Sequence, residues 1–79
     1  MIKINNTIVK IMKHLEEYGV LSRKNKPSEL SGLTFYLAVW YLRDKQIIKC
    51  NGFDERSKIW TLTEKGKRFL NIIKQLEVM

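Results

Sequence analysis

The segment Lys58–Leu70, KIWTLTEKGKRFL, most constrains the fold, because its hydrophobic period changes within a few residues. Trp60 and Leu62 alternate with polar neighbours, as in a strand that buries one face. From Thr63 onward the period becomes helical, and the apolar positions are Phe69, Leu70 and Ile73. Gly66 carries no side chain, so it lets this helix approach the strand closely. The sequence therefore predicts a strand that runs directly into a closely packed helix.

The same region predicts a second strand and leaves the start of the helix open. The segment IIKCN, followed by the turn-rich GFDERS, gives the other half of a hairpin. Cys50 is expected as a small core residue, and the alternative for this lone cysteine is an intermolecular disulfide. Thr63 can cap the last helix, with Glu64 in its first turn, where the helix dipole favours negative charge. Thr61, three residues before Glu64, offers a competing capping box.

The N-terminal region predicts a helix from about Thr7 that is capped by Asn5 or Asn6 and ends at Gly19. His14 lies among charged residues and is expected at the surface. The expected core positions of this helix share one face and are Ile8, Ile11, Met12, Leu15 and Tyr18.

The middle of the chain predicts a polar connection over 20–26 with room for a very short strand, then one helical turn from Pro27. Thr34 can cap a further helix over 33–45. Projection of this helix places its core face at Phe35, Val39, Leu42 and Gln46, with Ala38 at the edge. The order is thus helix, short helix, helix, hairpin, helix. It predicts an α+β winged helix-turn-helix fold, with a three-helix core, a two-stranded wing and a C-terminal helix, as a single domain over 1–79.

Two segments resemble PadR-like and MarR-like winged-helix regulators. LTFYLAVWYLRDKQII is similar to the recognition-helix segment of PadR-like proteins, and the matching positions are Thr34, Phe35, Tyr36, Ala38, Leu42 and Lys45. SKIWTLTEKGKRFL is similar to the junction between wing and last helix in both families. The small size and the richness in Ile and Lys also resemble winged-helix proteins of archaea and their viruses. The resemblance implies DNA binding, regulation of transcription and dimer formation through the last helix.

Composition narrows the function independently. The chain has 79 residues, and 15 Lys and Arg against 8 Asp and Glu give a net charge of +7, which favours a polyanion such as nucleic acid. One His, one Cys and no Gly-rich phosphate loop leave no catalytic, metal or cofactor site to assign, so we expect no enzyme. No small-molecule ligand is indicated. The start MIKINN is not a signal peptide and no apolar run reaches the length of a membrane span, so we expect a cytoplasmic protein without a membrane partner.

The helix over 33–45 raises the main question about function. Its outward side holds Leu33, Thr34, Leu37, Trp40, Tyr41 and Asp44, without the Arg, Lys, Asn or Gln that read base edges in the major groove. One interpretation is that Leu37, Trp40 and Tyr41 pack on the last helix, on a second subunit or on a partner. The other is apolar and shape-based DNA contact by the same side. The two resulting hypotheses are a homodimeric DNA-binding regulator and a protein-interaction module. RNA binding is a further alternative, because aromatic residues interleaved with basic residues can stack on unpaired bases.

Basic residues near this helix are the candidates for phosphate contact, although the positive charge is spread over the chain. These basic residues precede or follow the helix in loop and wing, and the further candidates on the helix itself are not basic. The candidate DNA-binding residues are Arg23, Lys24, Lys26, Thr34, Tyr36, Leu37, Tyr41, Lys49, Arg56 and Lys58. The last helix has a second apolar flank, which predicts a dimer interface at Ile72, Leu76 and Met79. The alternative is one wide apolar face laid on the first helix.

Overall fold

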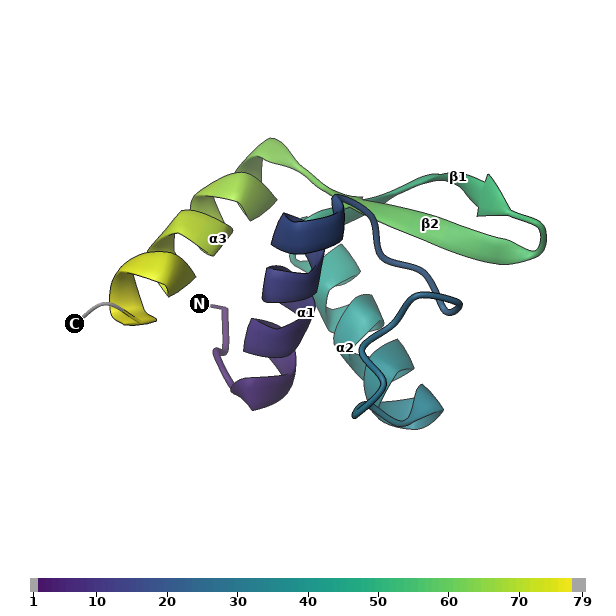
Figure 1. Cartoon of the computed structure of the whole chain (residues 1–79). Coiled ribbons are helices and arrows are strands. Elements are labelled where there is room, and N and C mark those ends of the chain that lie inside the picture. The colour runs from purple at the N-terminus through teal and green to yellow at the C-terminus, as the bar shows by residue number, and fades with distance from the viewer. Residues whose placement is uncertain (1, 78–79) are drawn as a thin grey trace.

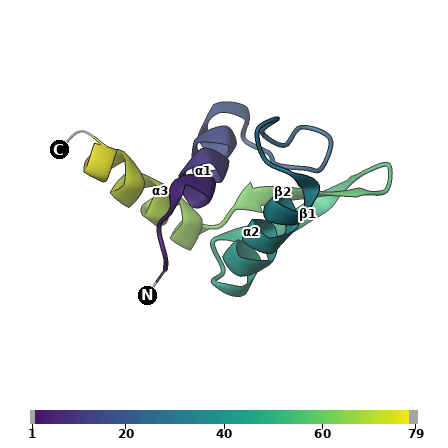
Figure 2. The ribbon, with the colours of Figure 1, turned by 90° about the horizontal axis from the view of Figure 1, so that it is seen from below.

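A computed structural model describes residues 2–77 of the chain (Figure 1). The elements are α1 (Asn6–Tyr18), α2 (Gly32–Asp44), β1 (Ile48–Asp54), β2 (Ser57–Leu62) and α3 (Glu64–Glu77). The views in Figures 1 and 2 both place α1 between α3 and α2, and the hairpin extends away past α2. The predicted α+β class is confirmed, and the order of elements is compatible with a small winged-helix layout.

Helix α1 forms largely as predicted. Asn5 is the N-cap, and its side chain accepts a hydrogen bond from the Ile8 N–H at 2.9 Å. Gly19 ends the helix with φ 77, and its N–H donates to the Leu15 carbonyl. The predicted core face is confirmed for Ile8, Ile11, Met12 and Leu15, which are all buried.

The prediction is wrong for two aromatic side chains of α1, Tyr18 and His14. Tyr18 is exposed, because it is the last residue of the helix and lies at the edge of its apolar face. Its ring instead contacts His14, with ring centroids 4.6 Å apart. His14 is half-buried rather than at the surface, and its Nε2 is buried without a hydrogen-bond partner.

The connection from α1 to α2 contains a one-residue strand and a single turn. Leu21 and Trp60 form an antiparallel bridge through hydrogen bonds of 2.9 and 2.7 Å, as the predicted short strand requires. The prediction of a short helix from Pro27 is wrong. A single hydrogen bond from the Leu30 N–H to the Pro27 carbonyl closes a turn there instead. The backbone of Ser31 is extended, so the turn cannot continue. Residues 2–77 therefore contain three α-helices rather than four.

Helix α2 begins and ends slightly differently from the prediction. Ser31, not Thr34, is the N-cap, and its side chain accepts from the Thr34 N–H. At the other end, Gln46 has φ 63 and its N–H donates to the Arg43 carbonyl, while the Ile47 N–H donates to the Leu42 carbonyl. This is a Schellman ending with a non-glycine residue in the left-handed position. Gln46 therefore lies beyond the helix and is exposed, so its predicted core position is wrong.

The hairpin is antiparallel and irregular. Ile48 pairs with Leu62 and Cys50 with Trp60, and the register shifts between Cys50 and Phe53 because β1 contains one extra residue. Only Ile48, at the base of β1, is buried. The rest of β1 extends beyond the helices, so the predicted core position of Cys50 is wrong and this thiol is exposed.

The junction between β2 and α3 is confirmed in detail. The Thr63 hydroxyl accepts from the Gly66 N–H at 2.9 Å and donates to the Gln46 carbonyl, so α3 starts after Thr63 and the competing start at Thr61 is wrong. A Cβ at Gly66 would lie 2.0 Å from the Ile47 carbonyl oxygen. Phe69, Leu70 and Ile73 bury as predicted. This junction fixes the base of the hairpin against α3, and it leaves the distal part of the hairpin beside α2.

Candidate nucleic-acid interface

The outer face of α2 is apolar and exposed. Phe35, Ala38, Val39 and Leu42 fill the core, and the opposite side is open. Leu33 is 71%, Leu37 54% and Trp40 50% exposed. Helix α3 packs against α1 and β2. The interpretation that Leu37 and Trp40 pack on the last helix is therefore wrong, and these two side chains remain free for another molecule.

Between α2 and the hairpin lies a groove of about 240 Å³ that we call the hairpin groove. Its aromatic side comes from α2 and its cationic side from the hairpin and the loop before α2. Phe35 and Val39 also line it. We define the groove by Arg23, Tyr36, Trp40, Arg56, Lys58 and Trp60.

The aromatic rings of this groove come from α2 and β2. Tyr36 and Trp40 lie one turn apart on α2, with ring centroids 6.1 Å apart and planes inclined by 33°. Trp60 is only 6% exposed, because the strand buries it against the core. The Lys58 ammonium lies 5.8 Å from the centre of the Trp60 ring, within cation–π range. The groove thus combines partly exposed aromatic faces with positive charge.

An ion pair next to the groove determines which cations are free. Lys24 lies 2.7 Å from a Glu55 carboxylate oxygen and 4.0 Å from an Asp54 oxygen. The two carboxylates of the hairpin tip are therefore directed at Lys24. Arg23, Arg56 and Lys58 form no ion pair within residues 2–77, so their charge is available to an anion.

The other predicted DNA-binding residues do not join the groove. The Lys26 ammonium donates to the Leu30 carbonyl at 2.6 Å, so it stabilises the turn before α2. Lys49 pairs with Thr61, whereas Cys50 pairs with Trp60. Since neighbouring strand residues point to opposite faces, Lys49 lies on the far side of the hairpin from the groove.

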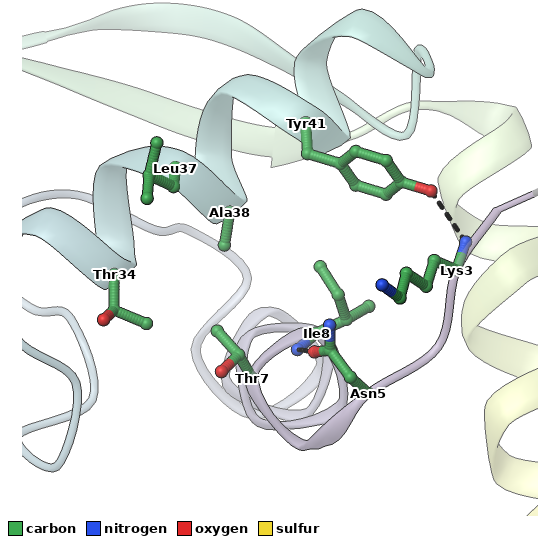
Figure 3. A pocket seen from close by; sticks show the side chains of 8 residues that line it. All are labelled: Lys3, Asn5, Thr7, Ile8, Thr34, Leu37, Ala38 and Tyr41. Carbon is green, nitrogen blue, oxygen red and sulfur yellow. Dashed lines mark hydrogen bonds between the residues drawn. The ribbon is translucent and has the colours of Figure 1, made fainter.

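Thr34, Leu37 and Tyr41 line a separate hollow of about 250 Å³ on the other flank of α2 (Figure 3). We call it the N-terminal hollow; its remaining lining comes from Lys3, Asn5, Thr7, Ile8 and Ala38. The Tyr41 hydroxyl accepts a hydrogen bond from the Lys3 backbone N–H at 2.7 Å, which ties the N-terminal segment to α2. Tyr41 is accordingly half-buried and serves the fold as well as the surface.

Sequence reasoning assigned Trp60 to the core alone and missed Lys3. The signal for Trp60 was its position two residues after Lys58 on the same strand, which places both side chains on one face. No sequence signal indicates Lys3, because its place beside Tyr41 depends on how the chain before α1 crosses α2.

The second apolar flank of α3 is exposed as predicted. Ile72 and Leu76 are both about half exposed, whereas Phe69, Leu70 and Ile73 face the core. The alternative of one wide face laid on α1 is therefore wrong for Ile72 and Leu76. Met79, the third predicted interface residue, lies outside the described residues.

Comparisons with protein-family models, curated proteins and solved structures found no match to this chain. Within residues 2–77, no group of His, Cys, Asp and Glu is arranged to hold a metal ion. No helix in that range has the length and apolar character needed to cross a membrane.

Proposed function

We propose that this chain is a winged-helix protein that binds double-stranded DNA and acts as a homodimeric transcription regulator. The observation that carries the proposal is the set of unpaired cations in the hairpin groove, Arg23, Arg56 and Lys58, which lie along one flank of α2. In a winged helix-turn-helix, loop and wing hold the phosphates on either side of the recognition helix. The net charge of +7 supports the same partner.

The mode of binding follows from what α2 offers. Between Thr34 and Leu42 it contains no Arg, Lys, Asn or Gln, so it has few groups for hydrogen bonds to base edges. Binding therefore relies on phosphate contacts and on the shape of the duplex. Leu37 can contact thymine methyl groups, and the hydroxyls of Thr34 and Tyr36 can reach phosphates. Ile72 and Leu76 provide the apolar surface for the dimer.

The test is a titration of random-sequence duplex DNA at low and moderate salt. Each phosphate neutralised contributes about 0.9 to the slope of log affinity against log salt. We expect Arg23→Gln and Arg56→Gln each to weaken binding several-fold and to lower that slope by about 0.9. Lys65→Gln on α3 is the matched control, because it removes the same charge from an exposed residue that does not line the groove. Affinity that does not change with salt, or equal effects of all three substitutions, would contradict the proposal.

The dimer is tested separately by mass measurement. Leu76→Lys introduces a charge into the exposed flank of α3 without touching the core. We expect it to convert a dimer into a monomer and to weaken DNA binding, since two linked sites bind better than one. A wild-type chain that is monomeric at all concentrations would remove this part of the proposal.

The second candidate function is a protein-interaction module. The exposure of Leu33, Leu37 and Trp40 on one helix face favours it, because contiguous apolar patches on monomers mark interfaces. Replacement of Leu37 and Trp40 by Ser would then abolish capture of a partner while the circular dichroism spectrum stays unchanged. Absence of duplex binding even at low salt would favour this candidate over the first.

A further inference from the structure

The α2 side of the hairpin groove offers ring faces rather than side chains that read base edges. Tyr36 and Trp40 both expose part of their rings, and the inclined arrangement of the rings leaves them without a closely stacked partner. In a paired duplex the face of each base is covered by its neighbours, so only edges are available to such a groove. A base that has left the stack exposes its face, and aromatic side chains bind such faces with little dependence on sequence.

The charges and size of the groove fit a single nucleotide. Arg23, Arg56 and Lys58 stand around the aromatic residues, so a base against the rings would have its phosphates near cations that lack acidic partners. The volume of about 240 Å³ is below the range of roughly 300–1,000 Å³ typical of pockets for drug-sized ligands. The groove therefore suits one base better than a larger aromatic anion.

We infer that the hairpin groove holds an unpaired nucleobase, with its ring against Tyr36 and Trp40 and its phosphates on Arg23 and Arg56. The inference rests on the proposed DNA binding. The aromatic side chains of α2 cannot read base edges through hydrogen bonds, but they can stack on an unpaired base. DNA with a locally unpaired nucleotide is therefore the preferred ligand. Extrusion of a paired base costs a few kcal/mol, whereas a base that is already unpaired avoids this cost.

The experiment compares two DNA probes of the same sequence, a fully paired duplex and the same duplex with one bulged thymidine. Dissociation constants are measured at one salt concentration, together with tryptophan fluorescence. Stacking of one base on an aromatic side chain contributes about 1–3 kcal/mol, so we expect the bulged probe to bind about tenfold more tightly. We also expect it to quench tryptophan emission more strongly than the paired duplex.

Variants assign the preference to the groove. Trp40→Ala should reduce the preference for the bulged probe to about twofold or less, and Trp40→Phe, which keeps an aromatic face, should restore most of it. Leu33→Ala is the matched control on the same helix, because Leu33 is exposed and does not line the groove. It should keep the full preference. Circular dichroism verifies that each variant is folded, and Trp40→Phe gives a second measurement if Trp40→Ala is not.

The outcomes separate the inference from the proposed function. Equal affinity of the wild type for both probes overturns the inference and leaves duplex binding in place. Retention of the preference in Trp40→Ala also overturns it, because the unpaired base would then lie elsewhere. Absence of binding to either probe overturns both the inference and the proposed function.

Discussion

Helices α1 and α2 have the same length and opposite exteriors. Each has 13 residues and four buried side chains, so each contributes one comparable face to the core. The exposed side of α1 is charged, with Lys10, Lys13, Glu16 and Glu17, as is usual for a helix at the surface. The exposed side of α2 instead carries Leu33, Leu37 and Trp40. The fold therefore needs only one apolar face from a helix of this size.

The difference indicates what the outer face of α2 is for. Leu37 and Trp40 fill no cavity in the chain, since about half of each side chain is exposed. Monomeric proteins rarely keep such residues contiguous unless another molecule covers them. Arg23 and Arg56 line the hairpin groove together with Trp40, and this is the basis on which we propose a polyanion with exposed ring faces as its occupant.

The largest expected effect tests whether only the inner face of α2 stabilises the fold, and it requires truncation of one leucine on each face. Leu42 is fully buried, and Leu42→Ala should lower the free energy of unfolding by about 3 kcal/mol through lost burial and an unfilled cavity. Leu37→Ala should change it by about 0.5 kcal/mol or less, because the side chain is already half in water. Urea denaturation followed by circular dichroism measures both. Similar losses for the two variants would mean that the outer face stabilises the fold after all.

A smaller effect is expected at the ends of the two helices. α1 ends on Gly19 with φ 77, whereas α2 ends through Gln46 with φ 63. A side chain in this left-handed conformation costs about 1–2 kcal/mol, part of which is offset by the greater freedom of glycine in the unfolded chain. Gly19→Ala should therefore destabilise by about 1 kcal/mol, and Gln46→Gly should stabilise by about 0.5–1 kcal/mol.

The same thermal or urea denaturation measures the signs of these two changes. Both sites are exposed, and no heavy atom outside the neighbouring residues lies within 4 Å of a Cβ added at Gly19, so contacts do not obscure the backbone effect. A loss of stability in Gln46→Gly would show that its side chain contributes more than the backbone conformation costs.

Local signals in the sequence were sufficient for much of the fold. The Asn5 cap, the Gly19 stop and the Thr63–Gly66 junction were predicted because each depends on residues within a few positions. Cys50 was misplaced because its burial depends on how far the hairpin extends beyond the helices. Gln46 was misplaced because a Schellman ending without glycine leaves no mark in the hydrophobic period.

The candidate site was predicted less completely, since it depends on contacts between distant segments. Sequence reasoning treated Lys24 and Arg23 alike, as candidates for phosphate contact. The structure separates them: Lys24 is directed at Asp54 and Glu55, and this leaves Arg23 and Arg56 without an acidic partner in the described residues. Neighbouring cations in one loop thus have different roles, and only their distances to the hairpin distinguish them.

The smallest expected effect concerns the charged exposed side of α1. Its charged exterior pairs with α3, since Glu16 lies 2.5 Å from the Lys74 ammonium and Lys13 lies 3.1 Å from Glu77. These side chains are partly exposed, so each pair should contribute about 0.5 kcal/mol or less. A double-mutant cycle with Glu16→Gln and Lys74→Gln should give that coupling at low salt. In about 1 M salt, where the screening length falls to about 3 Å, the coupling should fall below detection.

A coupling that survives high salt would mean that the contact between the polar face of α1 and α3 depends on more than the attraction of exposed charges. Packing between the aliphatic parts of the Glu16 and Lys74 side chains would then contribute to the coupling. The outer face of α1 would in that case form packing contacts, as we propose for α2.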